Sequence, residues 1–185
     1  MRKFNGIRPQ DIVLLLKLVA AGDSRVWLGK DLARELSLSA SEVSESLARC
    51  RYSRLLTSDP GSFQVHPRAL VEFLLHGLPY VFAAHPGPPA RGLVTGASAP
   101  PLSQTFGVEP AYVWPDAASE QWGAAIEPLY PGVPAAARRD ARLHELLALA
   151  DALRLGRPRE RALAGKLLEE AIGTLPTATY AAGTP

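Results

Sequence analysis

The side chains able to carry metal or nucleophilic chemistry are few and far apart along the chain. The four histidines and the single cysteine are His66, His76, His85, His144 and Cys50. None has the spacing to another such residue or to a carboxylate that a metal site uses. The sequence also lacks a glycine-rich phosphate loop, a nucleophile elbow and a paired-carboxylate motif. We therefore expect no enzyme activity, no metal and no cofactor, and Cys50 is predicted to be a core residue.

Arginines are the other chemically capable group, because guanidinium groups bind phosphates and carboxylates. Four of them fall close together near the C-terminus: Arg154, Arg157, Arg159 and Arg161. A solvated helix end is the simplest interpretation, and a site for a phosphate or an acidic partner is the alternative. The neighbouring acidic residues Asp140, Glu145 and Asp151 are interpreted as charges on a helix surface.

Charge is spread unevenly along the chain. Residues 1–56 hold ten Lys and Arg against six Asp and Glu, residues 57–134 two against six, and residues 135–185 eight against six. A polyanion would therefore meet the two ends rather than the middle. The lone cysteine excludes an internal disulfide framework, and no apolar run is long enough to span a bilayer. We expect a cytoplasmic protein without a membrane partner.

The elements that must position these groups begin with three helices. Apolar residues at helical spacing predict one helix over 9–22 and a second over 29–36. Ser39 followed three residues later by Glu42 forms a capping box, so a third helix starts there and runs to about residue 54. The gap of about three residues between the second and third helices has the length of a helix-turn-helix connection.

Short strand-like segments follow the third helix on either side of a Pro-Gly turn at 58–61. A two-stranded hairpin in this position is a wing, and a fourth helix is expected over 68–78. Residues 1–80 are therefore predicted to form a winged helix-turn-helix domain in a mainly α protein.

The run from Leu32 to Leu47 resembles the helix-turn-helix of MarR-type winged-helix repressors. The residues that carry the resemblance are Leu38, Ser39, Ser41, Val43, Ser44 and Leu47. The resemblance covers only this N-terminal domain. It implies a regulator of transcription, a repressor or autoregulator, that binds double-stranded DNA as a homodimer and reads the major groove with the helix at 40–54.

The predicted DNA-binding residues lie on or beside that helix. With Val43, Leu47 and Cys50 inward, the opposite face would reach base edges, and Arg49 is the leading candidate for a guanine contact. Basic residues at its flanks, among them Arg25, would contact the phosphate backbone. The complete set is Lys30, Ser39, Ser41, Glu42, Ser44, Glu45, Arg49, Arg51, Tyr52 and Arg54.

Three residues oppose this interpretation. Glu42 and Glu45 place negative charge where DNA would lie, and the predicted wing tip carries Asp59 instead of a basic residue. The alternative is a winged helix used as a protein–protein interaction module, such as an antitoxin-like partner protein. A third interpretation is a small-molecule sensor with a pocket lined by aromatic residues of the middle segment.

The remaining residues divide into an irregular segment, a helical hairpin and a tail. Nine prolines and six glycines between Ala83 and Val133 exclude long helices, so we expect residues 81–133 to form a wrapping segment with short strands near 92–95 and 111–114. Its aromatic residues are expected to pack on the N-terminal domain, and His85 and Arg91 are interpreted as surface residues rather than a pocket. Leucine stripes at three-four spacing predict a C-terminal helical hairpin over 134–175, followed by a flexible tail over 176–185. The hairpin would pack on the N-terminal domain or on a second copy.

Overall fold

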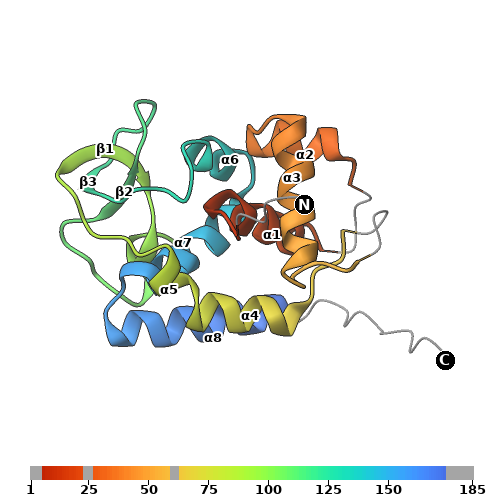
Figure 1. The fold of residues 1–185 in the computed structure, drawn as a ribbon. Helices are drawn as coiled ribbons and strands as arrows, with labels where there is room; N and C mark the ends of the chain where they lie inside the picture. Colours follow the sequence, from red (N-terminus) through yellow and green to blue (C-terminus); the bar gives the residue numbers. More distant parts are fainter. Residues whose placement is uncertain (1–5, 23–26, 59–62, 174–185) are drawn as a thin grey trace, which may run out of the picture.

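The computed structural model describes residues 6–22, 27–58 and 63–173, and these are mainly helical with one small sheet (Figure 1). The predicted positions of the first three helices are confirmed, and the expected fourth helix is divided at Gly77. The N-terminal helices are α1 (Pro9–Ala21), α2 (Gly29–Leu36), α3 (Ala40–Tyr52), α4 (Pro67–His76) and α5 (Leu78–Val81). Arg25, the predicted wing tip with Asp59 and the predicted tail at 176–185 lie outside the described residues.

Helix α1 is enclosed by other helices. All nine residues from Asp11 to Val19 are buried, although the pattern of apolar residues predicts burial on one broad face. The reason is that α1 packs against α3 on one side and against α7 (Ala141–Leu155) on the other. The C-terminal half of the chain therefore completes the core around the first helix.

The segments flanking the predicted wing turn are paired only briefly. Leu56 and Val65 form one isolated antiparallel bridge, and the Thr57 amide donates to the Gln64 carbonyl at 2.9 Å. This pairing follows α3 directly and leads into α4.

A sheet of three short strands occupies the middle of the chain, made of β1 (Pro89–Val94), β2 (Tyr112–Pro115) and β3 (Trp122–Ala125). One end of β1 pairs antiparallel with β3 and the other end with β2, while β2 and β3 pair in parallel. Each strand therefore contacts both of the others. The first two strands agree with the sequence-based expectation, and β3 was not expected.

Two glycines allow this tight closure. A Cβ atom on Gly92 would collide with the carbonyl oxygen of Trp114, and a Cβ atom on Gly123 would collide with that of Ala111. Strand backbones that approach so closely require residues without a side chain.

The C-terminal helices are α6 (Val133–Arg139), α7 and α8 (Pro158–Gly173). The expected helical hairpin is confirmed as α7 and α8, with α6 as an additional short helix before it. The hairpin packs on the N-terminal helices, α7 against α1 and α5, and α8 against α4. Within the described part of the chain, no helix is both long and apolar enough to cross a membrane.

Asp151 joins the sheet to α7 and is not the surface charge that helical periodicity predicts. It is 1% exposed, and it accepts hydrogen bonds from Thr95 Oγ1 at 2.8 Å and from Trp114 Nε1 at 2.6 Å. Burial raises the pKa of this carboxyl above its ordinary value, against the opposing effect of Arg154. Trp114 thus packs on α7, where its ring also lies 5.5 Å from that of His144.

Candidate nucleic-acid interface

The connection between α2 and α3 is only three residues long and is fixed at both ends. Ser37 adopts a left-handed conformation with φ 54° and closes α2. Ser39 caps α3, since its Oγ accepts from the Glu42 amide at 3.2 Å while the Glu42 carboxylate accepts from the Ser39 amide at 3.1 Å. These two hydrogen bonds confirm the predicted capping box. The bonds from Ser39 hold the pKa of Glu42 below its ordinary value.

A buried ion pair fastens α3 to α1. Arg49 Nε and Nη2 donate to the two carboxylate oxygens of Asp11 at 2.8 and 2.6 Å, and Ser46 Oγ donates to the same carboxylate at 2.6 Å. Asp11 is completely buried and Arg49 is 8% exposed. The hydrogen bonds from Arg49 to Asp11 raise the pKa of Arg49 above its ordinary value.

The expectation that Arg49 faces outward and contacts guanine is therefore wrong. Arg49 is one of the buried residues of α3, and its guanidinium group pairs with Asp11 on α1. A buried carboxylate without a partner is costly, and this cost decides the orientation of the arginine. The signal in the sequence is Asp11 itself, a lone acidic residue at the start of a run of apolar residues. Cys50 is fully buried as predicted.

The outer face of α3 is open. Ser41, Ser44, Glu45 and Ala48 are exposed, and Tyr52 is 69% exposed at the end of the helix. Within the described part of the chain, α1 and α2 are the helices with extensive contacts to α3, and these contacts are made by its buried residues. Glu45 lies 3.6 Å from Nη1 of Arg49, so part of its charge is neutralised within the helix.

The basic residues that were predicted to contact the DNA backbone lie around this face and differ in their exposure. Lys30 at the start of α2 and Arg54 after α3 are exposed. Arg51 is half-buried, with its guanidinium carbon 6.0 Å from the centre of the Phe63 ring. The structure thus places three of the predicted cations at the start of α2 and at the end of α3.

The second predicted cluster is only partly available for binding. Arg154 is held inside the protein, where its Nε donates to the Phe82 carbonyl at 2.7 Å and its Nη1 donates to Asp151 at 2.6 Å. Its expected role in phosphate or partner binding is therefore wrong. Arg157, Arg159 and Arg161 are exposed at the α7–α8 turn. In Figure 1 this turn lies at the lower left, away from α3 at the upper right.

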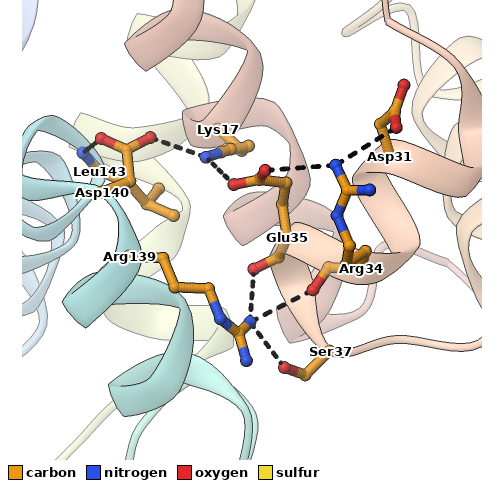
Figure 2. Close-up of polar contacts among 8 residues, drawn as sticks. All are labelled: Lys17, Asp31, Arg34, Glu35, Ser37, Arg139, Asp140 and Leu143. Carbon is orange, nitrogen blue, oxygen red and sulfur yellow. Dashed lines mark hydrogen bonds and ion pairs between the residues drawn. The ribbon is translucent and has the colours of Figure 1, made fainter.

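Two residues that are distant in the sequence form hydrogen bonds with the end of α2 and with the start of the α2–α3 connection. Arg139 Nη1, at the end of α6, donates to the carbonyl oxygens of Arg34 and Glu35 at 3.2 and 3.0 Å and to Ser37 Oγ at 2.9 Å (Figure 2). The Tyr130 hydroxyl donates to the Leu36 carbonyl. No local pattern in the sequence indicates these contacts, because the partners are about a hundred residues apart.

Apart from the outer face of α3, the described residues contain few groups that are arranged for binding or catalysis. They contain no group of three His, Cys, Asp or Glu side chains that could hold a metal ion. His85 and Arg91 are exposed. Comparison of the chain with protein-family models, with curated proteins and with solved structures gave no match.

Proposed function

We propose that this protein binds double-stranded DNA as a transcriptional regulator, with α2 and α3 as a helix-turn-helix and the paired segments after α3 as a wing. The observation that carries the proposal is the outer face of α3, which stays exposed within the described part of the chain while its inner face is fixed to α1. A rigidly mounted helix with one open face is the geometry that enters a major groove.

The roles of the side chains follow from their positions. Ser41, Ser44 and Tyr52 reach base edges or nearby phosphates, and Glu45 accepts a hydrogen bond from a cytosine amino group. Lys30, Arg51 and Arg54 neutralise phosphates and set the register of the protein on the duplex. Arg49 has no base contact in this scheme, because it supports α3 from inside.

In this proposal the protein acts in the cytoplasm as a symmetric dimer. Two copies related by a two-fold axis would place their α3 helices in successive major grooves, about 34 Å apart. The operator would then be a pseudo-palindrome with half-sites one helical turn apart.

The test is selection of binding sites from a random duplex pool, followed by titration of the selected duplex over a salt series. We expect an enriched, pseudo-palindromic sequence and an affinity that falls steeply with salt. Tyr52→Ala should reduce the preference for the selected duplex about tenfold, a loss of roughly 1–2 kcal/mol. Tyr80→Ala is the matched control, because Tyr80 is 78% exposed on α5.

Failure to enrich any sequence, together with a binding constant insensitive to salt, would overturn the proposal. Equal losses for Tyr52→Ala and Tyr80→Ala would show that α3 is not the reading helix.

A second function is favoured by one observation about charge. Among the exposed residues of α3 that precede Arg51, Glu42 and Glu45 are acidic and none is basic. Such a face also suits a basic protein surface, as in an antitoxin-like partner protein. Co-purification of the chain with the product of a neighbouring reading frame, abolished by Glu45→Arg and independent of DNA, would support this second function over the first.

A further inference from the structure

The last two residues of α6 reach in opposite directions. Arg138 Nε and Nη2 donate to Asp116 Oδ2 at 2.8 and 2.5 Å, and Nη2 also donates to Ser119 Oγ at 2.7 Å. Asp116 and Ser119 lie in the connection between β2 and β3. Arg139, the next residue, donates to the end of α2 and to Ser37. Two consecutive arginines therefore link the sheet to the α2–α3 connection.

The contacts of Arg139 add to the hydrogen bonds at the end of α2, where the Arg34 carbonyl also accepts from the Ser37 amide at 3.4 Å. The last carbonyl groups of a helix have no partner within the helix, and a guanidinium group can supply several donors in one plane. Here a single guanidinium nitrogen meets two of these carbonyl oxygens and the hydroxyl of Ser37, the residue that starts the turn toward α3 (Figure 2). The direction in which α3 leaves α2 is thus fixed partly by α6.

Lys17 fixes α6 itself in place. Its ammonium group is almost completely buried and lies 3.0 Å from a carboxylate oxygen of Glu35 on α2 and 2.8 Å from one of Asp140, which follows α6. Asp140 also accepts a hydrogen bond from the Leu143 amide at 3.0 Å and so caps α7 (Figure 2). Helix α1, the end of α2 and the corner between α6 and α7 therefore meet at one buried cation.

We propose that Arg139 is a positioning residue for α3, and that Arg138 connects it to the Asp116–Ser119 loop. The inference rests on the proposed function, since α3 is the helix to be positioned. Loss of the Arg138 contacts with Asp116 would therefore reach α3 through Arg139.

The first test measures amide hydrogen exchange in the full chain without DNA. Arg139→Ala should raise exchange in residues 37–43 on the order of tenfold, the effect of losing about one net hydrogen bond. Exchange in α7 and α8 should not change. Arg142→Ala is the matched control, since the Arg142 side chain is 51% exposed and pairs with Glu145 of the same helix at 2.8 Å. Unchanged exchange in 37–43 for Arg139→Ala would overturn the proposal.

The second test asks whether the loop and the turn are coupled. Asp116→Ala alone should raise exchange in residues 37–43 by a smaller factor than Arg139→Ala does. In the Arg139→Ala background it should add nothing, because the connection is already broken. If Asp116→Ala raises exchange in residues 37–43 by the same factor in the native chain and in the Arg139→Ala background, the loop acts by another route. That result would overturn the proposed coupling.

The third test uses DNA to separate positioning from general destabilisation. Arg139→Ala should weaken binding to the selected duplex about tenfold while binding to random duplex stays within about twofold, because phosphate contacts tolerate a rotated helix and base contacts do not. Equal weakening of both would contradict a positioning role. If no DNA is bound by the native chain, the proposed function fails alone, and the exchange experiments still decide the role of Arg139.

Discussion

At the scale of single residues, the two buried carboxylates Asp11 and Asp151 share one arrangement. Each is paired with an arginine and also accepts from a hydroxyl group, Ser46 for Asp11 and Thr95 for Asp151. The Asp11–Arg49 pair ties α3 to α1, whereas Asp151 and Arg154 both lie on α7, and the bonds from Thr95 and Trp114 to Asp151 tie the sheet to α7. Removing one partner of such a pair leaves a buried charge without compensation, which costs more than the pair contributes to stability.

Arg49→Ala is therefore predicted to act on folding. It should lower the free energy of unfolding by about 3–5 kcal/mol, because Asp11 stays buried without its ion-pair partner. Urea denaturation followed by circular dichroism measures this loss. Glu45→Ala is the control: Glu45 is 64% exposed beside the same arginine, and its loss should cost less than about 1 kcal/mol. A normal free energy of unfolding for Arg49→Ala would contradict the buried pair.

The Asp140 carboxylate predicts a pH dependence of stability. Burial raises the pKa of Asp140, but hydrogen bonds from Lys17 and from backbone amides outweigh this effect, and the net pKa lies below the ordinary value. The ionised form therefore stabilises the fold above the unfolded-state pKa, near pH 4, and this contribution disappears as the pH falls through the lower folded-state pKa.

Asp140→Asn tests this dependence, since asparagine keeps the cap on α7 but loses the charge. At pH 7 the variant should be less stable by about 1–2 kcal/mol. The difference from the native chain should shrink as the pH is lowered below about 4. Unfolding free energies measured from pH 7 to pH 2.5 provide the comparison, and a constant difference would show that Asp140 is not the titrating group.

At the scale of elements, sequence patterns predicted the helices whose position depends on residues close together in the chain. The capping box located the start of α3, and the leucine stripes at three-four spacing located the helices of the C-terminal hairpin. Strand β3 was missed because Trp-Gly-Ala-Ala has neither the alternation nor the β-branched residues of a strand. The strand forms because Gly123 has no side chain, which lets it pair closely with β1 and β2. This pairing depends on residues outside β3. The direction of Arg49 was likewise set by a residue on another helix.

Gly92→Ala is predicted to disrupt the sheet, because the new Cβ atom would collide with the carbonyl oxygen of Trp114 on the paired strand. The free energy of unfolding should fall by about 2–3 kcal/mol. Gly107→Ala is the matched control, since nothing lies within 4 Å of a Cβ atom there, and it should change stability by less than about 1 kcal/mol. Thermal unfolding of both variants measures the contrast, and equal midpoints would contradict the close pairing of β1 and β2.

At the scale of the whole molecule, the N-terminal helices are not a self-sufficient unit. Helix α7 covers one side of α1, α8 covers α4, and Lys17 on α1 pairs with Asp140 from the second half of the chain as well as with Glu35 from the first. The proposed winged helix-turn-helix thus shares its core with the C-terminal hairpin. Sequence patterns located both parts but could not show this sharing, because the packing of one amphipathic helix on another leaves no local signature.

A fragment of residues 1–82 is therefore predicted not to fold cooperatively. Without α7 and α8, the apolar side chains of α1 and α4 would be exposed to water, which removes much of the driving force for folding. Thermal denaturation followed by circular dichroism should show a single sharp transition for the full chain and a broad, featureless change for the fragment. A sharp transition in the fragment would contradict the shared core.

The enclosure of α1 has a consequence for synthesis on the ribosome. The helix leaves the exit tunnel long before the residues of α7 are translated, and at the usual elongation rate the delay is roughly ten seconds. During that interval Leu14, Leu15 and Leu16, each without exposed surface in the finished protein, have no completed pocket to enter. The nascent chain must therefore be shielded from other chains until its second half has emerged, so chaperone supply should limit its yield in cells.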